Sequence, residues 1–332
     1  MNHSKNKTVF ILGGAGYIGS HTAKQMHLAG YTPVVIDNLV YGHKDFVKWG
    51  PLHQCSLGDT QSMTTLFEKY KPLGVVHLAA FTYVGESVTK PGMYYENNVC
   101  ETLRLLEVMQ KVGCKHFIFS STCATYGIPE TIPITEEEKQ QPINPYGWSK
   151  LMAEQMIKDF GIAHGMTSVI LRYFNAAGAD LKGEVGENHN PESHLIPLVI
   201  DVALGRRESI SVFGTDYDTP DGTCIRDYIH VDDLSRAHVL SLKHLLAGKS
   251  STELNLGNGK GYSVKEVLSV VEKVSGKSIK VDYAPRRNGD SPILVGSSRK
   301  AKSVLGWEPQ IAELEAIVQS AWNWHRSTKS DS

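Results

Sequence analysis

From residue 8 onward, short apolar runs alternate with longer segments in which apolar residues recur about every 3.6 positions. The runs are uninterrupted, which is typical of parallel strands covered on both faces. They read TVFILGG, TPVVIDN, GVVHLAA, HFIFSST and TSVILRYFN. Segments between them, such as YYENNVCETLRLLEVMQKVG, have helical spacing and end at glycine, as crossover helices do. The pattern predicts an α/β fold built on a doubly wound parallel sheet.

This alternation weakens after about residue 176, where Gly- and Pro-rich loops, short strands and late helices follow. The predicted short strands lie in SISVFG, STELNLGNG and SIKVDYAP. A chain of 332 residues fits two domains at ~150 residues each. We expect residues 1–176 to form a first domain. Residues 177–332 are expected to form mainly a smaller C-terminal lobe, from which some segments return to the first domain.

Composition and charge narrow the choice of partners. The formal net charge is −1, and the apolar and charged fractions are ordinary for a globular protein. No basic excess indicates a nucleic-acid or anionic membrane surface, so we expect small molecules or copies of the same chain as partners. The apolar run TVFILGGAGYIG is too short to span a bilayer and lacks the plan of a secretory signal. A soluble, cytoplasmic protein is expected.

The five cysteines are odd in number, scattered and free of any C-x-x-C pair, which favours reduced thiols. No cluster of histidines and cysteines has the spacing of a zinc site, so we expect no metal. The stretch IHVDDLSRAH is better explained as the start of a helix, with Asp232 or Asp233 as its cap.

A glycine-rich loop, GGAGYIG, follows the first predicted strand and opens a helix. Its glycines, Gly13, Gly16 and Gly19, allow a tight turn and a close approach of the backbone to a pyrophosphate at the helix N-terminus. Asp37 ends the second strand, where an acid accepts from the ribose hydroxyls of NAD and repels the 2′-phosphate of NADP. The sheet is therefore predicted to be of the Rossmann type, with NAD as the cofactor.

The stretch INPYGWSK contains the only tyrosine of fourteen that is followed by lysine four residues later. Asn144 is a plausible N-cap and Pro145 a natural first helical residue, so Tyr146 and Lys150 share one helical face. If a tyrosine is to act as a base at neutral pH, its pKa must fall from ~10 to ~7, which requires about 4 kcal/mol of phenolate stabilisation. A lysine cation one turn away supplies part of it.

Upstream, SSTCATYG lies at the end of the strand HFIFSST. The carboxyl edge of a doubly wound sheet is where such folds bind their ligands. Ser121 or Thr122 is therefore placed to hydrogen-bond a reacting hydroxyl near Tyr146.

The spacing G-x-x-G-x-x-G followed by Tyr-x-x-x-Lys resembles the extended short-chain dehydrogenase/reductase superfamily. Within it, nearly the whole chain is similar to the UDP-glucose 4-epimerase family, through GGAGYIGSHT, VGES, NPYGWSK, LRYFN, GTDYDTPDGTCIRDYIHV and APRRNGD. The resemblance implies a homodimeric isomerase of galactose metabolism that interconverts UDP-glucose and UDP-galactose through a 4-keto intermediate. It also implies a tightly bound NAD that is regenerated in each turnover.

The resemblance implies residue roles as well. Tyr146 would take the proton of the sugar 4-hydroxyl, Lys150 would tune Tyr146 and hold the nicotinamide ribose, and Thr122 would bridge to the substrate. The implied cofactor contacts comprise these three residues with Gly13, Gly16, Tyr17, Ile18, Gly19, Asp37, Asn38, Leu57, Leu78, Ala79, Ala80, Thr82, Asn97 and Phe174.

The implied substrate contacts join Thr122 and Tyr146 with residues of the C-terminal lobe. The two arginines would serve the diphosphate and uridine side, where guanidinium groups suit a dianion. Leu294 would border the sugar 2-substituent. The further residues are Asn175, near the end of the first domain, and His194, Leu195, Phe213, Arg226, Arg287, Asp290 and Leu294 of the lobe.

The sequence departs from the family pattern at three places. CSLGDT offers Ser56, with Asp59 three residues later, where relatives often hold the adenine with an acid directly after the third strand. Thr82 stands where well-known bacterial enzymes carry lysine, and His194 replaces a common asparagine. Individual cofactor contacts near Ser56 and Thr82 are therefore expected to differ.

Three other functions remain as alternatives. SSTCATYG and INPYG are similar to the UDP-xylose/UDP-arabinose 4-epimerase branch, so a pentose or dual substrate stays open. A nucleotide-sugar dehydratase or decarboxylase would need an acid just after Thr122, where this chain has Cys123 and Ala124. A non-catalytic NAD-binding sensor would have no reason to combine Tyr146, Lys150 and Thr122.

Overall fold

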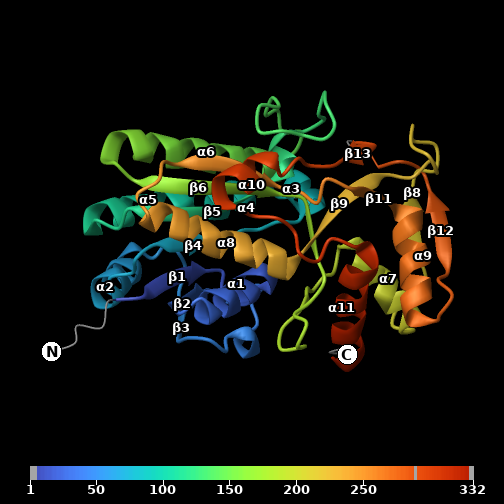
Figure 1. The fold of residues 1–332 in the computed structure, drawn as a ribbon, viewed down its shortest axis with the longest axis horizontal. Coiled ribbons are helices and arrows are strands. Elements are labelled where there is room, and N and C mark those ends of the chain that lie inside the picture. Colours follow the sequence, from blue (N-terminus) through green and yellow to red (C-terminus); the bar gives the residue numbers. More distant parts are fainter. Residues whose placement is uncertain (1–5, 288–289, 329–332) are drawn as a thin grey trace. The chain divides into compact units, whose positions relative to one another are not determined.

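A seven-stranded sheet forms the centre of the computed structural model, which describes residues 6–287 and 290–328 (Figure 1). Its order is β10-β6-β5-β4-β1-β2-β3, and the pairs β1 to β2, β1 to β4, β2 to β3 and β4 to β5 are parallel. The predicted doubly wound sheet is thus confirmed. The strands are β1 (Thr8–Leu12), β2 (Thr32–Asp37), β3 (Leu52–Gln54), β4 (Val75–His77), β5 (His116–Thr122), β6 (Thr167–Tyr173) and β10 (Thr252–Leu256).

The uninterrupted apolar runs are explained by burial on both faces of this sheet. Phe10 and Leu12 of β1 lie in one hydrophobic core, and Val9 and Ile11, which point to the other face of the same strand, are also fully buried. Strand β10, which lies in STELNLGNG well beyond residue 176, joins the same sheet beside β6. From β1 the chain continues to β2 on one side of the sheet, and from β4 it continues to β5 on the other side. The carboxyl ends of β1 and β4 therefore mark the switch point at which doubly wound sheets bind ligands.

Helices cover both faces of the sheet. α2, α5 and α6 pack side by side, and a hydrogen bond from Thr22 to Ser235 joins α1 to α8 (Figure 1). α5 and α6 end at glycines in the left-handed conformation, with φ of 77° and 66°. The helices are α1 (Tyr17–Leu28), α2 (Thr60–Tyr70), α5 (Glu101–Val112), α6 (Pro145–His164) and α8 (Val231–Leu246).

The segment predicted as one long crossover helix is built from three consecutive pieces. α4 (Pro91–Tyr95) is followed by a π-helical turn, η2 (Glu96–Cys100), and then by α5. Short elements nearby are α3 (Val84–Thr89) and the 3₁₀ turns η1 (Lys44–Phe46) and η3 (Cys123–Thr125). The π turn presents Asn98 to a loop after β4, so the irregularity has a structural purpose.

The chain divides into two compact units. Unit 1 comprises residues 1–127, 140–172 and 235–254, and unit 2 comprises residues 128–139, 173–234 and 255–332. In unit 2, β9 pairs in parallel with β7 and β13 and antiparallel with β11, while β8 pairs with β12. Its elements are β7 (Asn175–Ala177), α7 (Leu195–Ala203), β8 (Ile210–Phe213), β9 (Ile225–His230), β11 (Gly261–Ser263), α9 (Val264–Ser275), β12 (Val281–Ala284), β13 (Ile293–Leu294), α10 (Arg299–Leu305) and α11 (Leu314–Ser327).

The expectation that Asp232 or Asp233 caps a helix is wrong. α8 already begins at Val231, so both acids lie in its first turn. Asp233 Oδ2 instead accepts hydrogen bonds from the backbone N–H groups of Gln310 and Ile311, at 2.9 and 2.8 Å. The acid therefore binds a distant segment, a partner that local spacing could not reveal. Across the described ranges, every helix is too short or too polar to cross a membrane.

Candidate active site

The glycine loop connects β1 to α1, as predicted, and its glycines are needed for different reasons. Gly13 has φ of +76°, and a Cβ there would lie 2.6 Å from the backbone nitrogen of Ala79. A Cβ on Gly19 would lie 2.0 Å from Gly13 O. A Cβ on Gly16, by contrast, would have one atom within 4 Å, Gly13 O at 3.4 Å. The fold itself thus requires Gly13 and Gly19, whereas Gly16 keeps open the space in front of the α1 N-terminus, where a pyrophosphate would fit.

Asp37 lies at the end of β2 and is buried beside this loop. Its Oδ2 accepts from Ala15 N at 3.0 Å, and its Oδ1 accepts from Leu39 N at 2.8 Å. Burial raises the pKa of the carboxyl group, and the two backbone N–H groups oppose that rise. Each oxygen keeps a further lone pair, so the carboxylate both shapes the loop and can accept from a ribose hydroxyl.

The other predicted cofactor contacts of unit 1 lie at the start of α1, in the segments after β2, β3 and β4, and in the π-helical turn η2. Leu57 is buried in the core, while Asn38 and Thr82 are exposed. Asn98, which the sequence did not single out, organises the loop after β4: its side chain binds both N and O of Phe81 and also Ser149 Oγ. The remaining contacts of this group are Tyr17, Ile18, Leu78, Ala79, Ala80 and Asn97.

The polar side chains of the unusual CSLGDT segment bind other groups of the protein. Asp59 is the N-cap of α2 and accepts from Ser62 N at 3.0 Å. The hydroxyl of Ser56 donates to Glu101 Oε1 at 2.7 Å and accepts from Gly58 N at 3.1 Å. Since the Asp59 carboxylate caps a helix, we do not assign it to an adenine.

The start of α6 carries Tyr146 and Lys150 one turn apart. Asn144 Oδ1 accepts from Gly147 N at 2.9 Å and Pro145 is the first helical residue, which confirms the predicted cap. Lys150 is buried, donates from Nζ to Ser120 O at 2.9 Å, and lies 4.8 Å from the centre of the Phe119 ring. These contacts fix the ammonium group at the carboxyl end of β5.

Burial lowers the pKa of Lys150 to about 7, and the carboxylate of Glu154 opposes this shift. A neutral amine would give no charge stabilisation to a neighbouring phenolate. An anionic Tyr146 beside it would, however, favour the cation, because opposite charges stabilise each other. The proton positions on this tyrosine and lysine are therefore expected to be coupled.

Thr122 ends β5, and its Oγ1 accepts from Ala124 N at 3.1 Å, which leaves the hydroxyl proton available for a substrate. Ser121, the alternative, points elsewhere: its Oγ donates to Glu154 Oε1 at 2.5 Å. Glu154 in turn forms a fully buried ion pair with Arg172, 2.6 Å from Nη2 to Oε2. Of the two predicted hydroxyls, Thr122 is the one free to donate.

Unit 2 gathers five of the predicted substrate residues. The Arg287 guanidinium lies 4.8 Å from the centre of the Phe213 ring, and its Nε is 3.0 Å from Asp290 Oδ2. Arg226 Nη2 is 3.8 Å from Asp290 Oδ1, and Leu294 pairs with Arg226 across β13 and β9. Asn288 and Gly289 of the APRRNGD motif lie outside the described residues. The two cations and one aromatic face provide the chemistry that a uridine diphosphate requires.

The other lobe residues take different positions. Asn175 begins β7 and pairs with Tyr228 of β9. The side chain of Leu195, the first residue of α7, packs against the unit 2 core, and the Phe174 ring lies where a Cβ on Gly296 would be. The His194 ring turns toward two carboxylates, with Nδ1 2.8 Å from Glu187 Oε1 and 3.0 Å from Glu192 Oε1.

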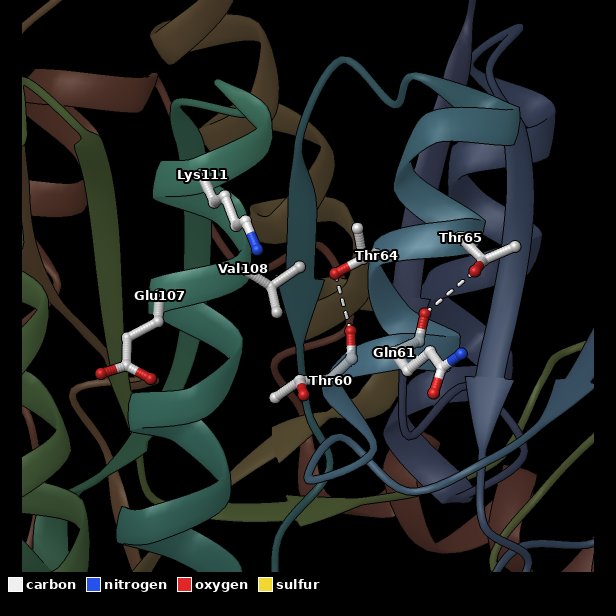
Figure 2. Close-up of a pocket in the computed structure, with 7 residues that line it drawn as sticks. All are labelled: Thr60, Gln61, Thr64, Thr65, Glu107, Val108 and Lys111. Carbon is white, nitrogen blue, oxygen red and sulfur yellow. Dashed lines mark hydrogen bonds between the residues drawn. The ribbon is translucent and has the colours of Figure 1, made fainter.

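A separate hollow of ≈ 500 Å³ lies between α2 and α5 (Figure 2). In it, the hydroxyls of Thr64 and Thr65 donate to the helix carbonyls of Thr60 and Gln61. Glu107, Val108 and Lys111 line it from α5, and the Lys111 side chain points toward α2 (Figure 2). None of the predicted site residues lines this hollow, so it is not part of the candidate site.

Comparison with known proteins places this geometry in a family. Residues 9–257 match the model of the NAD dependent epimerase/dehydratase family. The chain belongs to this family. It is 55% identical over 321 residues to a UDP-glucose 4-epimerase of Rhizobium meliloti (strain 1021), with 97% of this chain and 98% of the relative covered.

Two solved structures of family members are also similar. The UDP-glucose 4-epimerase from Brucella ovis in complex with NAD is 47% identical, with a TM-score of 0.94 and coverage of 96% of this chain and 98% of that chain. The enzyme from Bifidobacterium longum in complex with NAD⁺ and UDP is 39% identical, with a TM-score of 0.92 and coverage of 97% and 98%. The fold predicted from the sequence is therefore that of these family members.

Proposed function

We propose that this protein is an NAD-dependent UDP-sugar 4-epimerase, an isomerase that interconverts UDP-glucose and UDP-galactose through a 4-keto intermediate. The observation that carries the proposal is the pairing of Tyr146 and Lys150 on the first turns of α6 with Thr122 at the end of β5. The 55% identity to a UDP-glucose 4-epimerase over nearly the whole chain supports the reaction. Galactose metabolism is the corresponding pathway.

In this mechanism, Thr122 donates a hydrogen bond to the sugar 4-hydroxyl and Tyr146 takes its proton. The buried Lys150 ammonium stabilises the Tyr146 phenolate and binds the nicotinamide ribose. Bound NAD supplies a hydride acceptor for C4 and a donor for its return. Tyr146 then gives the proton back once the sugar has turned over, so the cofactor and the residues end each cycle unchanged.

Each unit carries its own share of the proposed residues. The glycine loop and Asp37 of unit 1 would hold NAD. Two features support this role: the space beside Gly16, and the two backbone N–H groups that orient the Asp37 carboxylate. Arg226, Arg287 and the Phe213 ring of unit 2 would hold the UDP moiety. We therefore keep the division into an NAD-binding domain, residues 1–176, and a mainly substrate-binding lobe, residues 177–332, as a proposal about function.

Product analysis tests the reaction directly. The purified protein is incubated separately with UDP-glucose, UDP-xylose and UDP-N-acetylglucosamine, and the nucleotide sugars are separated by chromatography. We expect UDP-glucose to yield UDP-galactose without added reductant, and denatured protein to release NAD. Conversion of the pentose alone would assign the chain to UDP-xylose/UDP-arabinose epimerisation. No conversion of any sugar would contradict the proposal.

We further infer a homodimer in the cytoplasm. Trp148 and Met152, four residues apart on α6, are 40% and 43% exposed, and the neighbouring α5 exposes Leu103. Apolar side chains gathered on adjacent helices favour burial against a second copy. None of the five cysteines forms a disulfide, which suits a reducing compartment.

A further inference from the structure

Four metal-ligating side chains meet in the loop that precedes α7. They are Glu187, His189, Glu192 and His194, and one ligand atom from each lies within 4.8 Å of all the others. His194 Nδ1 is 2.8 Å from Glu187 Oε1 and 3.0 Å from Glu192 Oε1. His189 Nδ1 is 3.2 Å from Glu187 Oε1 and 3.6 Å from Glu192 Oε2. Imidazoles and carboxylates therefore alternate around a common centre.

One of these ligands is buried in a way that calls for a cation. The Glu187 side chain is only 3% exposed, and its Oε1 has no hydrogen-bond partner of acceptable geometry within the described part of the chain. Two imidazole nitrogens lie within 3.2 Å of that oxygen, but their geometry is not that of hydrogen bonds to it. A buried carboxylate oxygen that accepts no hydrogen bond keeps its lone pairs available to a cation.

We propose that these four side chains bind one zinc ion or a zinc-like divalent cation. Zinc prefers four nitrogen or oxygen ligands in a tetrahedron, with metal–ligand distances of ~2.0–2.2 Å and hence ligand–ligand separations of about 3.3 Å. Three separations between prospective ligand atoms, 2.8, 3.2 and 3.6 Å, bracket that value. The longest separations in the group, up to 4.8 Å, must shorten by about 1.5 Å on binding, which rotations of long glutamate side chains can provide.

Neighbouring groups already orient the ligands as supporting contacts do in metal sites. Glu192 Oε1 accepts from the backbone N–H groups of Ser193 and His194, at 2.7 and 2.8 Å, so Oε2 is left to face the centre. Trp324 Nε1 on α11 donates to the backbone oxygen of Glu187 at 2.9 Å and so fixes the backbone of that residue. Such outer contacts fix ligand orientation and account for a good share of metal affinity.

The charges balance when a cation replaces protons. Without a metal ion, a proton on each of the two rings would balance the charge of the two carboxylates, and each ring has Nδ1 within 3.6 Å of an oxygen of both carboxylates. A divalent ion that binds the neutral rings displaces two protons and leaves the net charge of the cluster unchanged. No oxidation or further ligand is required.

The ion would be structural, because all four of its coordination positions are occupied by protein side chains. It would tie together the eight-residue loop segment 187–194, which directly precedes α7. The proposal stands on this cluster alone and does not depend on the proposed epimerase activity. Its sequence signal is a repeated Glu-x-His, in Glu187-x-His189 and Glu192-x-His194, separated by two residues. This repeat contains no cysteine and therefore lacks the histidine and cysteine spacing on which we based the expectation of no metal.

Metal binding can be measured without any activity assay. Tag-free, chelator-treated protein at pH 8 is titrated with zinc chloride by calorimetry, and with cobalt(II) by visible absorption. We expect one equivalent of zinc per chain, the intense d–d bands of tetrahedral cobalt without thiolate charge transfer, and a thermal unfolding midpoint several degrees higher with zinc. Glu187→Gln and His189→Gln should each weaken zinc binding at least 100-fold.

Glu184→Gln, which removes a carboxylate three residues before the cluster, is the matched control and should bind zinc like the wild type. Circular dichroism checks that each variant is folded. Two results would overturn the proposal: no binding of zinc or cobalt at 100-fold molar excess, or equal affinity in the wild type and both cluster variants. In either case the four side chains form only an ion-pair network.

Discussion

At the residue scale, the candidate chemistry depends on a few side chains whose freedom is restricted by their neighbours. Lys150 is held by Ser120 O and the Phe119 ring, and Ser121 is occupied by Glu154, which leaves Thr122 as the available hydroxyl. A proton transfer through Tyr146 would therefore occur among groups whose positions are already set, which reduces the reorganisation needed during turnover.

Tyr146→Phe should lower turnover of UDP-glucose by roughly 100- to 10,000-fold, because the proposed general base is removed. Folding and NAD content should stay close to those of the wild type, since the ring remains. Steady-state kinetics and the absorbance of released nucleotide measure both effects. Tyr283→Phe, on an exposed strand of unit 2, is the control. Wild-type turnover in the Tyr146 variant would contradict the mechanism.

Leu294→Ser should raise activity on UDP-N-acetylglucosamine relative to UDP-glucose. Leu294 lies opposite Arg226 on paired strands, and its branched end would occupy space needed by an acetamide. Because a filled site accommodates added atoms at about 1 to 3 kcal/mol, the ratio of the two kcat/KM values should rise about 10- to 100-fold. An unchanged ratio, with both activities reduced together, would mean that Leu294 only packs under its loop.

At the scale of elements, a buried polar network joins α6, which carries the proposed catalytic residues, to two strands. Glu154 of α6 binds Ser121 of β5 and Arg172 of β6, and Arg172 Nη1 also donates to Tyr126 Oη at 3.0 Å. Both charged side chains are almost completely buried, so neither can be compensated by water. The network therefore fixes α6, and with it Tyr146 and Lys150, against the end of β5.

Glu154→Gln should destabilise the protein by about 3 to 5 kcal/mol, because the Arg172 charge stays buried without its partner. Urea unfolding of Glu154→Gln, Arg172→Met and the double variant gives the coupling energy. The double variant should lose much less stability than the sum of the single changes. Gln155→Glu, on the exposed face of the same helix, should change stability little. Strictly additive losses would show that the two groups do not form a pair.

His77 of β4 should make stability depend on pH. Burial, with a contribution from Lys150, lowers its pKa to about 3, while the unfolded chain keeps the ordinary value near 6.5. Below pH 6.5 the unfolded state binds a proton that the folded state excludes. Stability is therefore lost as the pH falls from about 6.5 toward 3, by up to about 1.4 kcal/mol per pH unit.

His77→Phe is the test, because the ring lies near Phe117 and Phe119 and an aromatic replacement fits them. Free energies of unfolding in urea at pH 7.5 and 5.0 are compared with those of the wild type and of His27→Phe, whose histidine is exposed. The His77 variant should lose less stability at pH 5.0 than either. An equal loss in all three proteins would mean that His77 is charged when folded.

At the scale of the whole molecule, the two units differ in how their residues are collected along the chain. Unit 1 draws on three separate segments and unit 2 on three others, so the sequence passes repeatedly from one unit to the other. Each unit nevertheless has its own hydrophobic core. The proposed cofactor residues lie in unit 1 except for Phe174, and the residues proposed to bind UDP lie in unit 2.

The proposed homodimer predicts that Leu103→Glu combined with Met152→Glu produces monomers. Two charges on the exposed apolar face of α5 and α6 would have to be buried in the interface, at a cost that a second copy cannot offset. Light scattering after size-exclusion chromatography measures the mass. Val304→Glu, on α10 of unit 2, should remain a dimer. A wild-type monomer at micromolar concentration would contradict the inference.

Local sequence determined the features of this protein that depend on neighbouring residues. Uninterrupted apolar runs predicted the buried strands, Asn144 and Pro145 predicted the start of α6, and the glycine spacing predicted the turn after β1. Each follows from backbone geometry or burial within a few residues. The sequence of strands and helices was sufficient to predict the doubly wound sheet, because few topologies connect parallel strands.

Only the tertiary structure decided which polar groups are partners. Asp233 binds the backbone of residues 310–311, Ser121 binds Glu154 rather than a substrate, and Asn98 binds the loop at Phe81. These contacts join segments between 17 and 78 residues apart. Hydrogen bonding over such distances depends on how the elements pack, and buried polar groups accept whichever partner the packing supplies. Local spacing therefore predicted candidate polar residues for the site but not their partners.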